Sequence, residues 1–205
     1  MPRPRFAVLV TLLAGALLLA GCSGADSSRT PVAEPVATSI AQLDPAAMHL
    51  VRVAFCDLVP TVGVTRALGG TATSAETWGN GEPIPVVAGT EVAHEFGCSW
   101  SGPKRRTAQT WVFARPVDAA FARRLISSQA AAGGCITSQD GRFGTPAVTQ
   151  VCKLAGGTTR VRHAGLFGNT WLTCQVTGRS STTYDVRRSS DTWCAGVATA
   201  LDTGR

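Results

Sequence analysis

The residues best suited to chemistry in this sequence are its seven cysteines. No Cys-x-x-Cys pair occurs among them, which argues against a thioredoxin-like redox site and against a zinc knuckle. Because seven is an odd number, pairing in disulfides leaves one cysteine with a different role. The seven are Cys22, Cys56, Cys98, Cys135, Cys152, Cys174 and Cys194.

Cys22 is the cysteine that we expect to stay outside the disulfides, because a targeting signal precedes it. The basic stretch MPRPR is followed by 15 uncharged and mostly apolar residues, Phe6 to Ala20. This run is shorter than the roughly 20 residues that span a bilayer, so it fits a secretory signal peptide better than the alternative, an N-terminal anchor helix. Leu19-Ala20-Gly21-Cys22 resembles the lipobox of bacterial lipoproteins. The resemblance implies cleavage before Cys22 and lipid attachment to its sulfur.

The segment after the lipobox is expected to be a tether. Residues 22–43 are rich in Ser, Ala, Thr and Pro and show no sustained period, which is typical of a flexible linker. Residues 1–21 are then the signal peptide, and acyl chains on Cys22 anchor the protein to the outer side of the cell membrane. The globular domain is expected over residues 44–205.

The remaining six cysteines are expected to form disulfides, because export brings the chain into an oxidising compartment. Metal or redox use of these residues is the less favoured alternative. Several pairings are compatible with the sequence. We predict the sequential one, which closes loops of short or moderate length: Cys56–Cys98, Cys135–Cys152 and Cys174–Cys194.

Four helical segments are expected. In residues 44–58, Asp44 is a plausible N-cap, and Met48, Val51, Phe55 and Leu58 follow at helical spacing. A short helix after Pro60 should stop at Gly69-Gly70, and another should start at Pro116 to Asp118 and align Val117, Phe121 and Leu125. The last helix, over residues 189–204, has Ser189 or Ser190 as its cap and an apolar stripe of Trp193, Val197 and Leu201.

Alternating apolar and polar residues predict five strands, at residues 91–100, 107–115, 147–154, 158–166 and 169–178. Residues 71–90 are expected to be an irregular connection. Helices separated from runs of antiparallel strands indicate an α+β fold. We therefore predict a single two-layer domain, with an antiparallel sheet of about five strands packed against helices and stabilised by disulfides.

Two short motifs carry a resemblance to a known group of proteins. Cys56-Asp57-Leu58 lies near the start of the domain, and Cys98-Ser99-Trp100 follows some forty residues later. Together with the lipobox and the tether, they resemble actinobacterial secreted envelope lipoproteins of unknown function. The resemblance implies a location and a small α+β fold, related in appearance to the extracellular sensor domains of mycobacterial receptor kinases, and implies no activity.

The histidines are candidate catalytic residues. Alternation places His94 on one strand face with Phe96 and Trp100, as a core or edge residue, while Glu95 points the other way. His49 is expected to be exposed. His163 has Arg160 and Arg162 beside it, and two arginines on one strand face can hold a carboxylate or phosphate. The simpler alternative is a solvated strand face.

A second basic cluster, Lys104-Arg105-Arg106, lies at the expected hairpin turn. It can contact anionic lipid headgroups, or it is only an exposed, soluble turn. The formal net charge of +6 is mild once the basic residues of the signal peptide are removed, and no dense basic helix occurs. Nucleic-acid binding is therefore not expected.

The sequence contains no Gly-x-Ser-x-Gly elbow, Walker loop or dinucleotide fingerprint. We expect no metal, no cofactor and no catalytic activity. The favoured function is a lipid-anchored extracytoplasmic protein that binds a small ligand or an envelope protein, which predicts an apolar pocket or an exposed patch. The alternative is an envelope hydrolase, which requires His94 or His163 within hydrogen-bond reach of a serine or carboxylate in a cleft.

Overall fold

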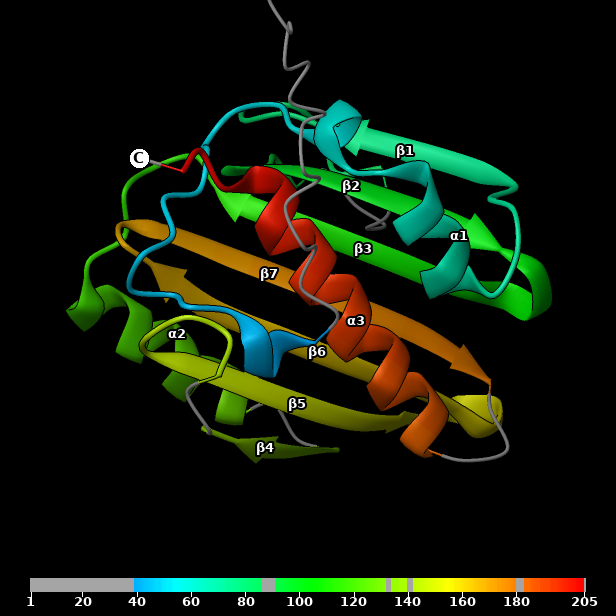
Figure 1. The fold of residues 1–205 in the computed structure, drawn as a ribbon. Helices are drawn as coiled ribbons and strands as arrows, with labels where there is room; N and C mark the ends of the chain where they lie inside the picture. Colours follow the sequence, from blue (N-terminus) through cyan, green and yellow to red (C-terminus); the bar gives the residue numbers. More distant parts are fainter. Residues whose placement is uncertain (1–38, 86–90, 132–133, 140–141, 180–182, 205) are drawn as a thin grey trace, which may run out of the picture. The chain divides into compact units, whose positions relative to one another are not determined.

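The computed structural model of the chain describes residues 39–85, 91–131, 134–139, 142–179 and 183–204. The expected signal peptide, the lipobox and residues 22–38 of the expected tether lie outside the described residues. In the described part, seven strands form one antiparallel sheet with three α-helices packed on it (Figure 1). The strands are β1 (Ser74–Trp78), β2 (Glu95–Gly102), β3 (Arg106–Phe113), β4 (Cys135–Ser138), β5 (Ala147–Leu154), β6 (Thr158–Phe167) and β7 (Thr170–Arg179). The helices are α1 (Thr61–Leu68), α2 (Ala119–Ala131) and α3 (Thr183–Leu201), with 3₁₀ turns η1 (Ile40–Gln42), η2 (Cys56–Leu58), η3 (Pro103–Arg105) and η4 (Ala155–Gly157).

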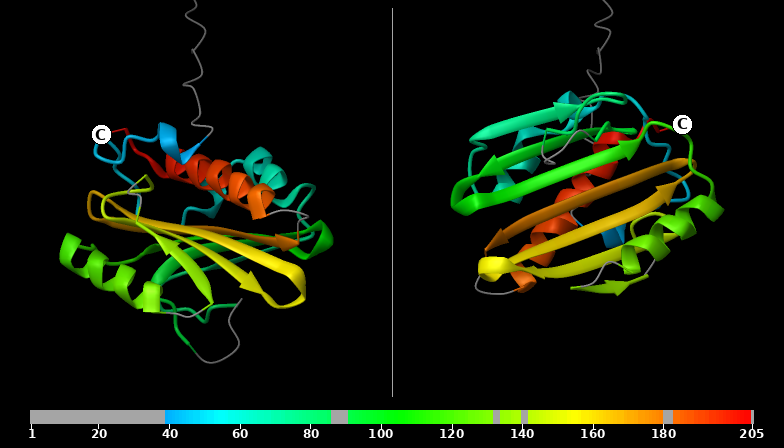
Figure 2. Two further views of the ribbon diagram at one scale, coloured as in Figure 1. Left: turned by 90° about the horizontal axis from the view of Figure 1, so that it is seen from below. Right: turned by 180° about the vertical axis from the view of Figure 1, so that it is seen from behind.

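The strands lie in the order β1-β2-β3-β7-β6-β5-β4, and helices cover both faces of the sheet. Figure 2 shows α1 and α3 on one face and α2 on the other. We call these the α3 face and the α2 face. The α+β class is therefore confirmed, but the sheet has seven strands instead of about five, and α2 adds a third layer to the two that were expected.

The central strands follow from the sequence pattern. The expected ranges 147–154, 158–166 and 169–178 match β5, β6 and β7 to within one residue. Tight turns join them, and Gly156, Gly157 and Gly168 have φ values of +68°, +72° and +60°, which favour glycine. The two strands that we did not predict, β1 and β4, are the edges of the sheet. They are short, and four of the five residues of β1 are exposed, so alternation is weak there.

Residues 44–58 do not form the predicted helix. Met48 and Leu50 are buried on either side of the exposed His49, an alternation that belongs to an extended chain. The backbone of this segment pairs with the end of the chain: Val51 N–H donates to the Leu201 carbonyl (3.1 Å), and Leu50 forms a β-bridge with Asp202. This backbone pairing keeps the segment extended, although its apolar residues have helical spacing. Leu58, which was predicted to lie on the apolar face of the helix, is 50% exposed.

The globular domain includes residues before its expected start at residue 44. Ser39 caps η1, its hydroxyl accepting from Ala41 N–H, and Ile40 is 5% exposed within the main core. Residues 39–43 therefore belong to the domain, because Ile40 contributes apolar area to the core and η1 satisfies its own backbone groups.

Helix α3 starts six residues before its predicted cap. Its apolar stripe of Trp193, Val197 and Leu201 is buried as predicted, with none of the three more than 3% exposed. Ser190, one of the two predicted caps, lies instead inside the helix, where its hydroxyl donates to the Val161 carbonyl of β6 (3.0 Å). A polar contact with the sheet thus replaces the predicted capping role.

Helix α2 covers one end of the α2 face. Asp118 caps it by accepting from Phe121 N–H (2.6 Å), close to the predicted start. The predicted stripe is shifted, because Ala122 and Ile126 are the buried helical residues while Phe121 is 37% exposed. These residues pack on Val148, Ala164, Leu166 and Trp171, a second and smaller core.

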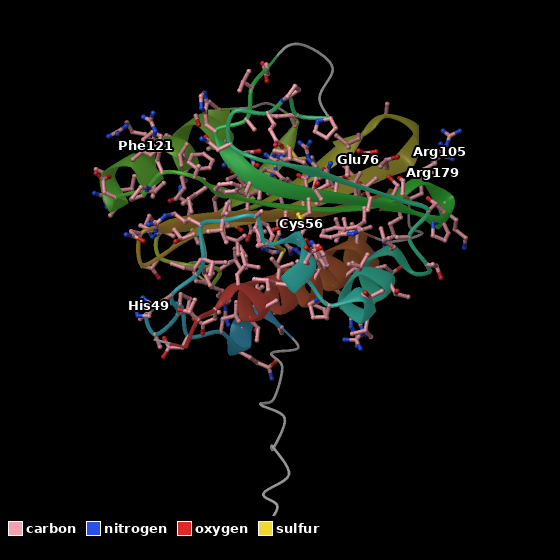
Figure 3. The ribbon with its side chains drawn as sticks, turned by 90° about the horizontal axis from the view of Figure 1, so that it is seen from above. His49, Cys56, Glu76, Arg105, Phe121 and Arg179 are labelled. Carbon is pink, nitrogen blue, oxygen red and sulfur yellow. A yellow bond between two sulfur atoms is a disulfide. The ribbon has the colours of Figure 1, made fainter. Side chains whose placement is uncertain are left out.

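Three disulfides join elements that are neighbours in the fold. They are Cys56–Cys98, Cys135–Cys152 and Cys174–Cys194, the sequential pairs. Cys56–Cys98 links η2 to β2, Cys135–Cys152 links the register partners of β4 and β5, and Cys174–Cys194 links β7 to α3. Figure 3 shows His49, Arg105, Phe121 and Arg179 at the periphery, whereas Cys56 lies nearer the middle of the view and is partly buried against the core.

Candidate functional site

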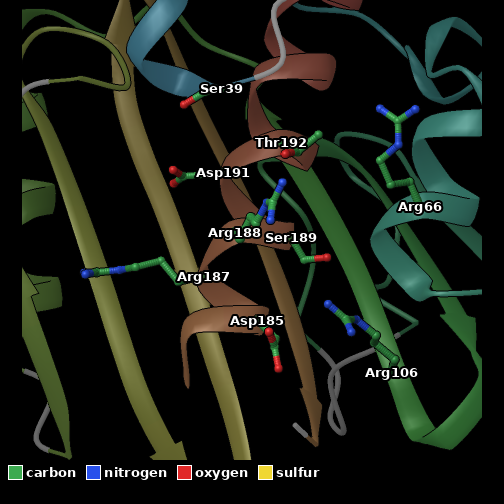
Figure 4. A pocket seen from close by; sticks show the side chains of 9 residues that line it. All are labelled: Ser39, Arg66, Arg106, Asp185, Arg187, Arg188, Ser189, Asp191 and Thr192. Atoms are coloured by element: carbon green, nitrogen blue, oxygen red, sulfur yellow. The ribbon is translucent and has the colours of Figure 1, made fainter. Parts of the chain in front are cut away.

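A groove of about 930 Å³ runs over the exposed side of α3 (Figure 4). We call it the α3 groove. Its lining combines residues from η1, α1, β3 and α3, elements that are far apart in the sequence. Four of the nine lining residues are arginines and two are aspartates, so positive charge is in excess: Ser39, Arg66, Arg106, Asp185, Arg187, Arg188, Ser189, Asp191 and Thr192.

Three arginines reach the side of the groove between α3, α1 and β3. Arg66 comes from α1, Arg188 from α3, and Arg106 extends from β3 toward Ser189 and Asp185 (Figure 4). No hydrogen bond or ion pair joins the side chain of Arg66 or of Arg188 to another described residue. Guanidinium groups in this state can bind carboxylate or phosphate oxygens with paired hydrogen bonds.

Arg106 is more buried than the other two. Burial lowers its pKa, and the charge of Asp185 acts in the opposite direction. Its Nε atom is buried and has no hydrogen-bond partner. Arg106 belongs to the expected basic cluster, and the other two members, Lys104 and Arg105, are exposed at the tip of the β2–β3 hairpin with φ values of +56° and +57°. The cluster therefore divides, with one arginine in the groove and two residues in solvent.

On the other side of α3, the groove adjoins a cavity of about 290 Å³ that contains His163. Arg187 and Asp191 line both. His163 is 2% exposed, and its Nδ1 lies 3.0 Å from the Thr149 hydroxyl. Its Nε2 lies 3.3 Å from Asp191 Oδ1. The two groups are close, but their geometry is not that of a hydrogen bond.

The His163 arrangement brings a histidine, a hydroxyl and a carboxylate together, as the hydrolase hypothesis requires. All three residues line the same cavity, although Thr149 is only 3% exposed. The contacts join β5, β6 and α3 beneath the helix, which is also what a structural polar cluster does.

A smaller apolar pocket of about 170 Å³ lies between α1 and α3. Arg66, Ser189 and Thr192 line both this pocket and the α3 groove, so the two are continuous. It is a pocket of the kind that the binding hypothesis predicts. Its apolar walls include Val59, Pro60, Val62, Ala67, Trp193 and Val197.

The predicted anion-binding pair, Arg160 and Arg162, lies on the α2 face. Arg162 belongs to a row of polar side chains that runs across four strands, Ser99, Gln109, Gln175 and Arg162, which we call the polar row. Arg162 Nε donates to Gln175 Oε1 (2.8 Å), Gln175 donates to Gln109, and Gln109 donates to Ser99 (3.1 Å).

Both arginines of the pair are engaged with protein groups. The Arg162 guanidinium lies 5.4 Å from the centre of the Trp111 ring, and burial, together with the charge of Arg160, lowers its pKa to about 10. Arg160 Nη2 lies 3.5 Å from Cys152 Sγ, and its Nε is buried without a partner. They do share one strand face, as predicted, but anion binding there stays a prediction.

His94 is not the core or strand-edge residue that we predicted. It is exposed and precedes β2, which begins at Glu95. Glu95 instead lies on the α2 face, where Trp78 Nε1 donates to its carboxylate (3.2 Å). Burial raises the pKa of Glu95, whereas this hydrogen bond and the charge of Arg162 act against the rise.

Sequence analysis missed Arg66, Arg187 and Arg188. Arg187 and Arg188 were overlooked because the last helix was expected to begin after them, at Ser189 or Ser190. Asp185, Arg188, Ser189 and Thr192 are spaced three and four residues apart, which would have revealed one polar helical face. No sequence signal connects Arg66 with this face.

Comparisons with known proteins are sparse for this chain. No family model and no curated protein matches it. Among solved structures, the extracellular domain of PknH from Mycobacterium tuberculosis is similar with a TM-score of 0.48 and 16% identity, over 75% of this chain and 98% of that one. Within the described ranges, no helix is both long and apolar enough to cross a bilayer, and no group of three or more potential metal ligands occurs.

Proposed function

We propose that this chain is a non-catalytic, lipid-anchored protein of the cell envelope, and that its domain binds an anionic ligand in the α3 groove. The observation that carries the proposal is that Arg66, Arg106 and Arg188, from three different elements, line the same groove. Asp185 is the acidic residue that acts on Arg106, and neither Arg66 nor Arg188 has a described ionic partner. A carboxylate or phosphate group complements this side of the groove.

The size of the groove supports a small molecule or one end of a larger one. Ligand sites commonly measure about 300–1,000 Å³ and combine a few oriented polar groups with an apolar wall. The α3 groove, at about 930 Å³, falls within this range and adjoins an apolar pocket. Arginine side chains on a helix and a hairpin can also adjust to a ligand more readily than groups fixed inside a sheet.

The anchor is the second part of the proposal and depends on Cys22. Its support is the run Phe6 to Ala20 followed by the lipobox. Mass spectrometry of the native protein, purified from membranes, tests it by reporting the mass at the mature N-terminus. A diacylglyceryl group on Cys22 is the expected result, and a mature chain free in the medium without acyl groups would contradict the anchor.

The same preparation tests the binding function. Native mass spectrometry should detect a copurified acidic ligand on the wild type. The double variant Arg66→Gln/Arg188→Gln should lose it. The matched control, Arg123→Gln/Arg124→Gln, removes two exposed arginines from α2 on the opposite face and should keep the ligand. Equal retention by both variants would overturn the assignment to the groove.

An envelope hydrolase is the second candidate, favoured by the approach of His163 to Thr149 and Asp191. Hydrolysis of a p-nitrophenyl ester by the wild type, abolished in His163→Gln and in Thr149→Val, would establish it. We expect no turnover above the buffer rate, because both side chains are almost fully covered by protein.

A further inference from the structure

The apolar pocket between α1 and α3 has two glycines in its walls, Gly63 and Gly196. Each lies inside a helix, where glycine is less favourable than alanine by about 1 kcal/mol. Neither has a positive φ, and a Cβ atom built at either position meets no heavy atom within 4 Å. Backbone conformation and close packing therefore do not require glycine here.

The effect of the two glycines is to keep the pocket open. A larger side chain at either position would extend into the space that the pocket occupies, because both residues line it. The pocket measures about 170 Å³, and an apolar cavity of about 150 Å³ stays dry and accepts a benzene molecule. It can thus hold several methylene groups.

The polar end of the pocket is also defined. Arg66 lines both the pocket and the α3 groove, as do Ser189 and Thr192. Arginine can lay its aliphatic stem along an apolar wall while its guanidinium stays in the polar part. A ligand seated here therefore meets hydrocarbon walls at one end and positive charge at the other.

We infer that the ligand of the α3 groove is an anionic amphiphile, with a hydrocarbon chain between Gly63 and Gly196 and a phosphate or carboxylate group near Arg66 and Arg188. This inference rests on the proposed anion site and adds the second half of the ligand. Charge complementarity favours this occupant over a neutral apolar molecule. Val62, which lines the pocket and is 65% exposed, leaves its rim apolar, so a chain longer than the pocket can continue along the surface.

The test uses the full-length chain with Cys22→Ser, so that no acyl group of its own competes. Isothermal titration calorimetry compares inorganic phosphate with ethyl, butyl and hexyl phosphate, and with the neutral hexyl glucoside. Affinity should rise about fourfold for each added methylene until the pocket is full, because that is the effect of moving one CH₂ out of water. Hexyl glucoside should bind at least tenfold more weakly than hexyl phosphate.

A cavity-filling variant links the effect to the pocket. Gly196→Leu places a side chain where the hydrocarbon should lie, and it should remove the dependence on chain length while leaving the affinity for inorganic phosphate unchanged. Gly63→Leu provides an independent second version. Ala130→Leu, at an exposed position of α2 on the other face, is the control and should bind like the wild type. Circular dichroism and thermal unfolding check that each variant folds.

The possible failures are distinct. If phosphate binds and chain length has no effect, the amphiphile is overturned and the anion site stands. If hexyl glucoside binds as tightly as hexyl phosphate, or if none of the phosphates binds, the anion site itself is overturned. Tighter binding of an acidic peptide with one phenylalanine would assign the pocket to a side chain of a partner protein and overturn the amphiphile.

Discussion

The two faces of the sheet use arginine in contrasting ways. On the α2 face, Arg162 is hydrogen-bonded to Gln175, lies over Trp111 and has a pKa lowered to about 10 by burial. On the α3 face, Arg66 and Arg188 line a groove and have no described ionic partner. Arginines that stabilise a fold are enclosed and satisfied, whereas arginines that can bind a ligand keep their donors available. By this criterion, the α3 face is the better candidate for the proposed binding function.

The largest expected effect is a loss of stability on removing a disulfide, and its size should differ between the two faces. In Cys174→Ala/Cys194→Ala, two fully buried sulfurs between β7 and α3 are lost, with a sequence separation of 20 residues. The free energy of unfolding should fall by at least about 3 kcal/mol, from loop entropy and from lost packing. Urea denaturation measures it.

The comparison is with Cys135→Ala/Cys152→Ala, a bridge at the β4 edge with a separation of 17 residues. The two disulfides close loops of similar length, so their entropic contributions to stability should be similar. Because Cys135 is only partly buried, less packing is lost, and the free energy of unfolding should fall by less. An equal or larger loss at the β4 edge would contradict the view that the α3 face holds the main core.

Breaking the polar row should have the next largest effect. Gln175→Ala leaves Arg162 Nε and Gln109 Oε1 without their partner in a site where Gln175 is 6% exposed. Unsatisfied buried groups of this kind cost about 1–3 kcal/mol, so we expect a loss of about 2 kcal/mol in urea denaturation. Gln139→Ala, at an exposed position, is the control and should change stability by less than about 0.5 kcal/mol.

A smaller effect should appear in the pH dependence of stability. Because burial raises the pKa of Glu95, folding favours its protonated form. This contribution is present below the ordinary glutamate pKa of about 4.3 and is lost as the pH rises through the raised value. The wild type should therefore lose stability relative to Glu95→Gln as the pH rises from about 4 through the raised pKa of Glu95, by less than the Gln175 change.

Urea denaturation across that range checks the sign. Glu76→Gln, in the exposed neighbouring strand β1, controls for the removal of one carboxylate from the same face. A constant difference between the wild type and Glu95→Gln at all pH values would show that the Glu95 environment does not favour protonation.

The smallest effect is expected for the groove. Arg66→Gln and Arg188→Gln should each change the free energy of unfolding by less than about 0.5 kcal/mol, because neither side chain has a described partner to leave unpaired. Arg162→Gln should cost several times more. Similar losses at all three positions would remove the distinction between enclosed and available arginines.

Sequence patterns identified the centre of the sheet well, for a physical reason. Strands β5, β6 and β7 are buried along most of their length, so each contains several apolar residues, and glycines mark the turns between them. Edge strands β1 and β4 bury little and leave a weak pattern. The segment 44–58 failed for the opposite reason, since its apolar spacing suits a helix while backbone pairing with residues 201–203 keeps it extended.

The candidate site could be predicted only in part. Arg160 and Arg162 lie close together in the sequence and were therefore noticed, yet Arg162 belongs to the polar row and Arg160 contacts Cys152. Arg66, Arg106 and Arg188 come to line the same groove only when α1, β3 and α3 pack together. Their positions in the sequence therefore do not indicate a common site. An apolar pocket could be expected from the sequence, but its position could not.

Residues 49–51, near the start of the domain, pair with residues 201–203 at its end. Val51 N–H bonds to the Leu201 carbonyl, Thr203 N–H bonds to the His49 carbonyl, and His49 N–H bonds to the Asp202 carboxylate. The first and last residues of most domains are poorly ordered unless other parts of the fold hold them, and here hydrogen bonds join the two segments to each other. Amide hydrogens at both ends should show the same protection factor in hydrogen exchange, because a single opening step exposes both.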